Sequence, residues 1–523
     1  MPDFQSSPEL TRQTPGAAIG PVSSSVAGLR QAMADGSLTA TALTRYYLDR
    51  IAEVNPALRA VITVCPDALE QAASSDAAWQ SGQPRGALEG IPVLVKDNVQ
   101  VAGAPTTAGS PALLDAQAPD AFIVAKLREA GAIILAKANM SEWANFRSTR
   151  SSSGWSTVGG QTANPYALDR NPSGSSSGSA AGVSAGFAPL AIGTETDGSI
   201  VSPSSACGVG GIKPTAGLVS RAGIVPISLA QDTAGPMAAS VADAAVLLSA
   251  LAVADSGDSA DDHPYRSGGP PDYTAFLDPA ALQGARIGIW RQTSHGGPFA
   301  ATDAILNLAI GQLGVLGAVV IDPVELPDVD KVSEPEFQAL NIEFKHDLNA
   351  YLGYLASYAH GGDLPATLAE LIAFNERNAP SVLARFGQEI FEVAEATSGN
   401  LNDPGYLELR AAANRIARTA VETPAVEHRL DAIVSLTASP AWLTDYILGD
   451  HYVFGTSHAG AVSGWPAITI PFGYVRGLPV GVTVLGPRWS EPRLIALAYA
   501  FEQATKSRRP PALLPTITAT TEA

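Results

Sequence analysis

Apolar positions in the first half of the chain change repeatedly between helical and strand spacing. Between 26 and 55 they recur every three or four residues, which predicts two short helices. The continuous apolar run at 91–95 predicts a short buried strand that ends at Lys96. A helix over about 120–130, a strand over 132–135 and a helix that begins near Ser141 follow. This alternation predicts an α/β layer architecture.

The rest of the chain places a long helical region among further strands. Residues 254–275 are rich in Asp, Ser, Gly and Pro, which predicts a surface excursion. The simplest interpretation is one large α/β domain over about 24–510, with a mostly helical insertion at about 336–429 and an N-terminal extension at 1–23. The other expected elements are a small-residue helix at 179–186, strands at 430–437, 467–472 and 480–485, and a closing helix at 491–505.

Composition and charge narrow the class of protein. Apolar residues make up 46% of the chain and charged residues 16%, which predicts a compact soluble globule. No apolar run reaches the roughly 18 to 20 residues that cross a bilayer, and the N-terminal residues lack the pattern of a secretory signal. We therefore expect a cytoplasmic protein without a membrane partner. The net charge of −18 would repel a phosphate backbone, so nucleic acid is not an expected partner.

The two cysteines indicate neither a disulfide framework nor a metal site. Cys65 and Cys207 lie far apart in the chain, in apolar or small-residue surroundings. We expect both to be buried thiols.

Lys96 is the first residue with candidate chemistry. Partial desolvation at the end of a buried strand lowers the pKa of a lysine, because it favours the neutral amine, and a neutral lysine can act as a base. Asp97 follows, but successive residues of an extended chain point to opposite faces, so its carboxylate need not lie beside the amine. A lysine that extends its amine into solvent is the other interpretation, and Lys96 taken alone favours it.

Two turns rich in Gly and polar residues supply candidate hydroxyl groups. The first, SGSSSGS at 173–179, lacks the Gly-Lys-Ser/Thr ending of a phosphate loop and leads directly into a helix, unlike a flexible linker. It favours a strained turn that presents hydroxyl groups near a helix N-terminus. The second, GTETDGSIVSP at 193–203, offers consecutive backbone N–H groups that suit an oxyanion hole ending at Ser199. An ordinary polar turn is the alternative, and a spatial triad of Ser199 with one of the C-terminal histidines also stays open.

Three segments, in this order, resemble the amidase signature family of serine hydrolases: GIPVLVKDN at 90–98, SSSGSAAG at 175–182 and GTETDGSI at 193–200. The resemblance implies the amidase signature fold, in which a large central mixed β-sheet is covered by helices on both faces, with a signature core at about 85–240. Further matching segments are GVGGIKPT at 208–215, SEWANF at 141–146, GGQTANP at 159–165, QDTAGPM at 231–237 and GLPVG at 477–481.

The resemblance also implies roles for individual residues. Ser199 is the implied nucleophile, Ser175 the middle serine and Lys96 the base of a Ser-cisSer-Lys triad. The middle serine would follow a cis peptide bond with Gly174. The implied donors of the oxyanion hole are the backbone N–H groups of Thr196, Asp197, Gly198 and Ser199.

Three positions depart from the usual pattern of the family. Glycine pairs are more usual at 173–174 and at 197–198, and arginine is more usual at Val201. The side chain of Asp197 competes for space with the expected oxyanion donors. The last two departures favour the branch of the family that removes the C-terminal amide of peptides.

The function that the resemblance implies is amide hydrolysis through an acyl-enzyme, without cofactor or metal. The first interpretation is release of ammonia from the C-terminal amide of peptides. The second is hydrolysis of aryl or other small amides by the same mechanism, and the third is a transamidating subunit that passes ammonia to a partner. We expect a monomer or a simple homo-oligomer that binds a small amide or an amidated peptide.

Overall fold

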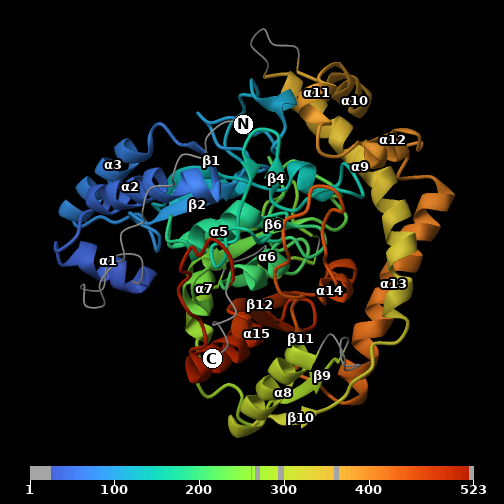
Figure 1. Cartoon of the computed structure of the whole chain (residues 1–523). Coiled ribbons are helices and arrows are strands. Elements are labelled where there is room, and N and C mark those ends of the chain that lie inside the picture. The colour runs from blue at the N-terminus through green and yellow to red at the C-terminus, as the bar shows by residue number, and fades with distance from the viewer. Residues whose placement is uncertain (1–24, 261, 266–270, 292–299, 359–363, 518–523) are drawn as a thin grey trace, which may run out of the picture.

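An 11-stranded mixed sheet runs through the centre of the structure, which is a computed structural model (Figure 1). The strand order is β1-β3-β2-β6-β8-β7-β12-β13-β11-β9-β10. The structure describes residues 25–260, 262–265, 271–291, 300–358 and 364–517, so the expected N-terminal extension at 1–23 lies outside it. The strands of the sheet are β1 Val61–Val64, β2 Pro92–Lys96, β3 Ile133–Ala138, β6 Leu190–Glu195, β7 Gly210–Lys213, β8 Thr233–Ala238, β9 Arg286–Ile289, β10 Val319–Ile321, β11 Ala432–Leu436, β12 Ala467–Val475 and β13 Leu478–Leu485.

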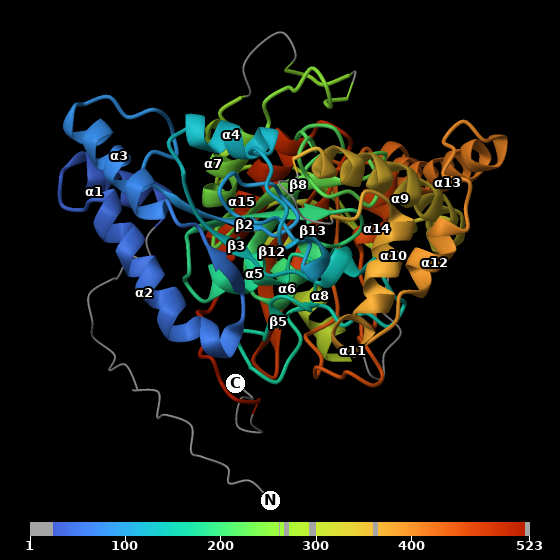
Figure 2. The ribbon, with the colours of Figure 1, turned by 90° about the horizontal axis from the view of Figure 1, so that it is seen from above.

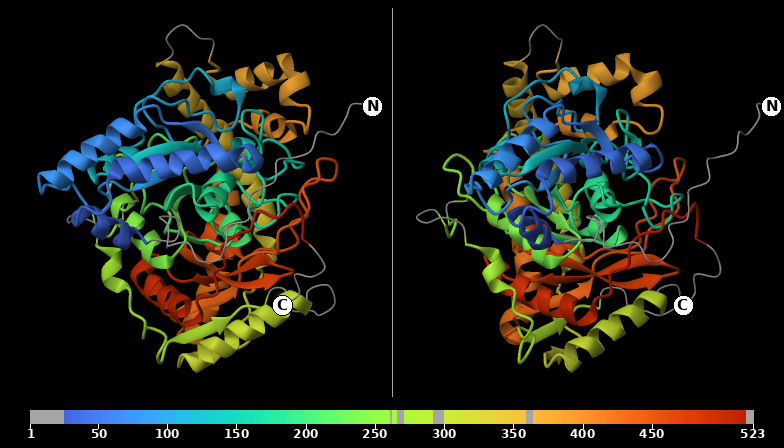
Figure 3. Two further views of the ribbon diagram at one scale, coloured as in Figure 1. Left: turned by 60° about the vertical axis from the view of Figure 1, so that its left-hand side comes forward. Right: turned by 90° about the vertical axis from the view of Figure 1, so that its left-hand side faces the viewer.

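Helices cover both faces of this sheet. In Figure 2, α4, α7 and α15 lie on one side of the strands, and α5 and α6 lie on the other. Figure 3 shows α2 and α3 near the β1 end and α8 beside β10 and β11 at the other end. The helices are α1 Val26–Ala34, α2 Ala40–Leu58, α3 Ala68–Gln80, α4 Phe122–Glu129, α5 Ser177–Ser184, α6 Val201–Ala206, α7 Val241–Leu251, α8 Ala300–Val315, α9 Ser333–Ala356, α10 Leu368–Arg377, α11 Ala379–Val382, α12 Glu389–Glu395, α13 Pro404–Glu427, α14 Ser457–Ser463 and α15 Glu491–Thr505.

The main apolar core lies between the sheet and these helices. A second apolar cluster packs α9 against α12, where the rings of Phe344 and Phe391 stack with centroids 5.3 Å apart. Cys65 and Cys207 are buried and free, as expected. Within the described ranges, no helix has the length and apolar character that crossing a bilayer requires.

Most of the elements expected from the sequence are confirmed. The strand that ends at Lys96 is β2, and the closing helix at 491–505 is α15. The two N-terminal helices are present, although the second, α2, is longer than expected and reaches Leu58. The expected helical region corresponds to α9 through α13. The described part of 254–275 is mostly loop, but Tyr273 is buried and anchors it to the body of the protein.

The expected helix near Ser141 is wrong. A short 3-10 turn, Glu142–Asn145, occupies this position, and Trp143 and Ala144 adopt φ of 52° and 54°, which no right-handed helix accommodates. The indole of Trp143 packs edge-on against Phe391 of α12, with ring centroids 5.8 Å apart. The backbone N–H of Trp143 donates to the Ala108 carbonyl at 2.9 Å. Tertiary contacts therefore override the local sequence pattern here.

Candidate active site

Lys96 and Thr194 lie at the same edge of the sheet because β2 and β6 are parallel neighbours. Val95 of β2 pairs with Ile192 of β6, and parallel strands end at a common edge. Lys96 Nζ donates to Thr194 Oγ1 at 2.8 Å and to the Thr194 carbonyl at 3.2 Å. It also donates to Ser175 Oγ at 2.8 Å. The amine is thus held by three neutral oxygen atoms.

Burial governs the protonation of Lys96. The side chain is 0% exposed, and desolvation lowers its pKa from 10.5 to about 7, although the charges of Asp232 and Glu195 oppose the shift. Asp97 points away and pairs with Lys137 at 3.6 Å, as the alternation of an extended chain predicts. The interpretation of Lys96 as a solvent-exposed strand end is therefore wrong. Near neutral pH, a large fraction of its amine is uncharged and can accept a proton.

The Gly/Ser-rich loop delivers Ser175 to this amine. The peptide bond between Gly174 and Ser175 is cis, as the family resemblance implies. Ser176 Oγ donates to the Thr194 carbonyl at 3.0 Å and accepts from the Thr194 N–H at 3.1 Å. These two hydrogen bonds fix the loop to β6, and the hydroxyl of Ser175 thereby reaches Lys96.

The turn between β6 and α6 carries Ser199 and is fixed by the carboxylate of Glu195. Glu195 Oε2 accepts from the N–H groups of Ile200 at 2.7 Å and Val201 at 3.1 Å. Fixed N–H groups without a partner can stabilise an oxyanion without reorganisation. In the described part of the chain, no group accepts a hydrogen bond from the backbone N–H of the four expected donors, Thr196, Asp197, Gly198 and Ser199.

Ser199 lies beside Ser175 but is not hydrogen-bonded to it. The Ser176 N–H donates to the Ser199 carbonyl at 3.1 Å, which sets the two loops side by side. Ser199 is 8% exposed and lines a cleft whose walls include Trp442 and Tyr452. Among the residues that the structure describes, no hydrogen bond joins the hydroxyls of Ser199 and Ser175. Of the implied triad, the hydrogen bond between Lys96 and Ser175 is therefore present, and one between Ser175 and Ser199 is not found among the described residues.

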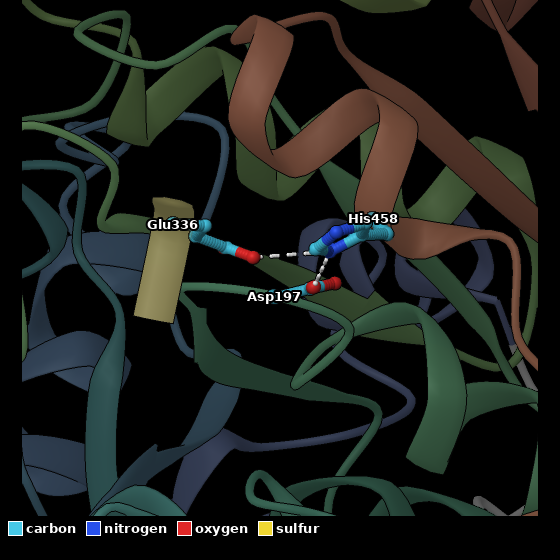
Figure 4. Close-up of side chains that lie close together, drawn as sticks. All are labelled: Asp197, Glu336 and His458. Atoms are coloured by element: carbon cyan, nitrogen blue, oxygen red, sulfur yellow. Dashed lines mark hydrogen bonds and ion pairs between the residues drawn. The ribbon is translucent and has the colours of Figure 1, made fainter. Parts of the chain in front are cut away.

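A cluster that the sequence did not predict adjoins the nucleophile turn (Figure 4). His458 Nδ1 lies 2.6 Å from Asp197 Oδ2 and 3.2 Å from Glu336 Oε2. Burial lowers the pKa of His458, but the two carboxylates outweigh it and raise the value to about 9. Burial alone would raise the pKa of Asp197, whereas His458 lowers it. His458 is therefore protonated at neutral pH and forms an ion pair with Asp197.

The same three residues have side chains that can bind metals, and their ligand atoms lie within 4.8 Å of one another. Nδ1 of His458 lies within hydrogen-bond distance of both carboxylates, which is the geometry of a protonated imidazole in an ion-pair cluster. Across the described ranges, no histidine is hydrogen-bonded to Ser199, and His458 contacts Asp197 instead. The signal for this cluster in the sequence was Asp197 itself, which stands where glycine is more usual in the family.

The chain is similar to known amidases over nearly its whole length. A family model described as Amidase matches residues 42–495. A probable amidase of Arabidopsis thaliana is 41% identical over 493 residues, which are 92% of this chain and 90% of that protein. One of the subunits of the glutamyl-tRNA(Gln) amidotransferase of Symbiobacterium thermophilum is 34% identical over 498 residues, which are 92% and 97% of the two chains.

A solved structure gives the same picture. Native peptide amidase from Stenotrophomonas maltophilia superposes with a TM-score of 0.88 at 46% identity, covering 94% of this chain and 99% of that one. The 11-stranded mixed sheet with helices on both faces is the architecture that the resemblance to this family implied. The chain therefore belongs to the amidase signature family and is an amide-hydrolysing enzyme.

Proposed function

We propose that this enzyme hydrolyses the C-terminal amide of peptides and releases ammonia, with Ser199 as nucleophile, Ser175 as proton relay and Lys96 as base. The similarity to the Stenotrophomonas maltophilia peptide amidase, at 46% identity, supports the choice of substrate. The single observation that carries the mechanism is the fully buried amine of Lys96, which is hydrogen-bonded to Ser175 Oγ at 2.8 Å. A buried amine with a pKa of about 7 is suited to general-base work near neutral pH.

In the proposed reaction, a proton passes from Ser199 through Ser175 to Lys96 and later returns by the same path. Lys96 accepts the Ser175 proton while the Ser175 oxygen accepts the Ser199 proton, and Ser199 Oγ attacks the amide carbon. The proton returns along the same path to the leaving nitrogen, which departs as ammonia. Water then attacks the ester formed on Ser199 and loses a proton to the relay. The relay returns this proton to Ser199 Oγ as the ester C–O bond breaks, and the free acid leaves. The hydrogen bond between the two serines has to form with substrate bound, and catalytic hydrogen bonds often tighten only in the complex.

The proposed oxyanion hole lies in the turn that carries the nucleophile. Attack on the amide places negative charge on the former carbonyl oxygen. The N–H groups at 196–199, which have no acceptor among the described residues, are available to donate to this oxygen. The loss of one such donor typically costs about 10²- to 10³-fold in rate. The bonds from Glu195 to Ile200 and Val201 keep the turn in this shape.

Ser199→Ala tests the nucleophile. We expect release of ammonia from an N-acetylated dipeptide amide to fall by about 10⁴-fold or more, because no hydroxyl remains to form the acyl-enzyme. Ser202→Ala is the matched control, since Ser202 lines the same cleft and contacts the hydroxyl of Tyr452 at 3.3 Å. This control should keep its kcat. Full activity in Ser199→Ala would remove Ser199 from the mechanism.

Two alternatives use the same site and differ in the acceptor or leaving group. Similarity to an amidotransferase subunit favours transamidation with a partner as a second candidate. Size-exclusion chromatography combined with the ammonia assay separates an active lone enzyme from an obligate complex. Rates on a panel of amidated peptides, aryl amides and aliphatic amides distinguish the peptide amidase from an amidase of small amides. We also propose domain limits of about 24–510, which enclose the family match at 42–495.

A further inference from the structure

Asp197 lies within the row of proposed oxyanion donors, yet its carboxylate is turned toward α14 (Figure 4). Asp197 Oδ2 is 2.6 Å from Nδ1 of His458, and Glu336 Oε2 of α9 is 3.2 Å from the same nitrogen. His458 Nε2 lies 3.2 Å from Ser333 Oγ, also on α9. The imidazole ring is therefore fixed through both nitrogens, and it ties the nucleophile turn to α9.

An unpaired carboxylate at position 197 would oppose catalysis in two ways. Its charge adjoins the turn where the negative charge of the oxyanion develops, and like charges repel more strongly where water is excluded. An aspartate side chain also readily accepts the N–H of the residue two positions on, which here is Ser199. Asp197 Oδ1 is buried and has no hydrogen-bond partner among the described residues. The side chain of Ser457 on α14 also lowers the pKa of this carboxylate, but less than His458 does, so His458 is its main anchor.

Charged groups face this cluster from several elements. Asp330 adds to the effect of the two carboxylates on His458. Lys213 of β7 acts on Asp197, and Arg410 of α13 acts on Glu336. Gln231 Nε2 donates to Glu336 Oε1 at 2.6 Å and to the Thr196 carbonyl at 2.9 Å, which links the cluster to the turn a second time.

We propose that protonated His458 is a positioning residue for amide hydrolysis, which neutralises Asp197 and holds its carboxylate away from the N–H of Ser199. This inference rests on the proposed function, since it concerns the same oxyanion donors. It assigns a role to a histidine that does not touch the nucleophile, and it explains how an aspartate is tolerated where glycine is more usual.

His458→Gln tests the inference, because glutamine is of similar size and carries no charge. For the N-acetylated dipeptide amide we expect kcat to fall about tenfold with little change in KM, since the loss falls on the transition state. Adding Asp197→Gly should restore much of kcat, because the charge and the competing acceptor are then both absent. A merely structural role of His458 predicts no such rescue. His346→Gln, which breaks a comparable 2.8 Å contact with Asp347 on α9, is the matched control and should keep its kcat.

The pH profile gives a second measurement that needs no histidine variant. In the wild type, kcat should fall on the alkaline side as His458 loses its proton through a pKa of about 9, and Asp197→Gly should remove this limb. If His458→Gln does not fold, the pH profiles of the wild type and of Asp197→Gly still test the inference. An alkaline limb that is unchanged in Asp197→Gly overturns it.

Two further results would also overturn it. The first is a His458→Gln enzyme with wild-type kcat and a wild-type alkaline limb. The second is a double variant that is no more active than His458→Gln. Ser199→Ala in the same assay distinguishes failure of the proposed function from failure of the inference about His458. An active Ser199→Ala enzyme would contradict the proposed function. An inactive Ser199→Ala enzyme together with a fully active His458→Gln enzyme would contradict only the role of His458.

Discussion

The acid side of the pH–rate profile is the most quantitative consequence of burying Lys96. With a pKa of about 7, roughly half of the amine is neutral at pH 7 and roughly 1% at pH 5. We therefore expect kcat/KM for an N-acetylated dipeptide amide to fall about tenfold for each pH unit below about pH 6. Steady-state rates of ammonia release between about pH 5 and pH 8 measure this limb directly.

Asp232 provides a perturbation of known sign. Its carboxylate opposes the lowering of the Lys96 pKa, and burial raises the pKa of Asp232 itself to about 6. Asp232→Asn should therefore move the acid limb to lower pH, and the gain should be seen above about pH 6, where Asp232 is charged. At pH 6.5 about a quarter of the wild-type amine is neutral, so the gain in kcat/KM at that pH has a ceiling of about fourfold. Asparagine keeps one carbonyl oxygen, which can still accept from the N–H groups of Ile227 and Ser228, now at 2.8 and 3.0 Å from the carboxylate.

Asp243→Asn is the matched control for this experiment. Asp243 is a buried aspartate of α7 that accepts from the Val26 N–H at 2.8 Å, and it is not among the charges that act on Lys96. Asp243→Asn should keep the acid limb of kcat/KM at the same pH as the wild type. An acid limb centred below about pH 5, or a shift to higher pH in Asp232→Asn, would mean that the titrating group is not a buried amine beside that carboxylate.

Lys96 and the side-chain cluster give three further predictions. Lys96→Met should lower kcat by about 10⁴-fold or more, because the base is removed. It should also raise the unfolding temperature near pH 6, because an apolar side chain replaces a buried amine. A lower unfolding temperature would mean that the lost hydrogen bonds outweigh the cost of desolvating the amine. In the wild type, Lys96 should make the free energy of unfolding rise between about pH 7 and 10.5, where the unfolded chain holds a proton that the folded amine does not, and a rise of the same size in Lys96→Met would contradict this. EDTA should leave kcat unchanged, because base, relay and donors are protein groups; a loss of activity would favour a metal-dependent amidase and make Asp197, Glu336 and His458 the first ligands to test.

The elements that the sequence predicts well are those whose signal lies within a few residues. The apolar run of β2 and the helical spacing of α15 are local patterns, and both are confirmed. The turn at Trp143 could not be predicted in this way. Its left-handed φ depends on packing against Phe391, a residue of a distant helix.

The same distinction between local patterns and tertiary contacts applies to the site. Motif resemblance assigns Lys96, Ser175 and Ser199, and the structure brings the end of β2 and the two loops that carry the serines to one edge of the sheet. The low pKa of Lys96 could not be derived from the sequence, because it depends on burial beneath β6 and the Gly/Ser-rich loop. The contact of Asp197 with His458 spans 261 residues, and no local pattern encodes such a pairing.

The most direct test of Ser199 as nucleophile is to trap the acyl-enzyme. The enzyme is mixed with an N-acetylated dipeptide amide, quenched in acid within the first turnover and digested for mass spectrometry. We predict that the peptide containing Ser199 gains the mass of the acyl group and that Ser199→Ala shows no such adduct. An adduct on a different residue, or turnover without any adduct on the enzyme, would contradict the proposed mechanism.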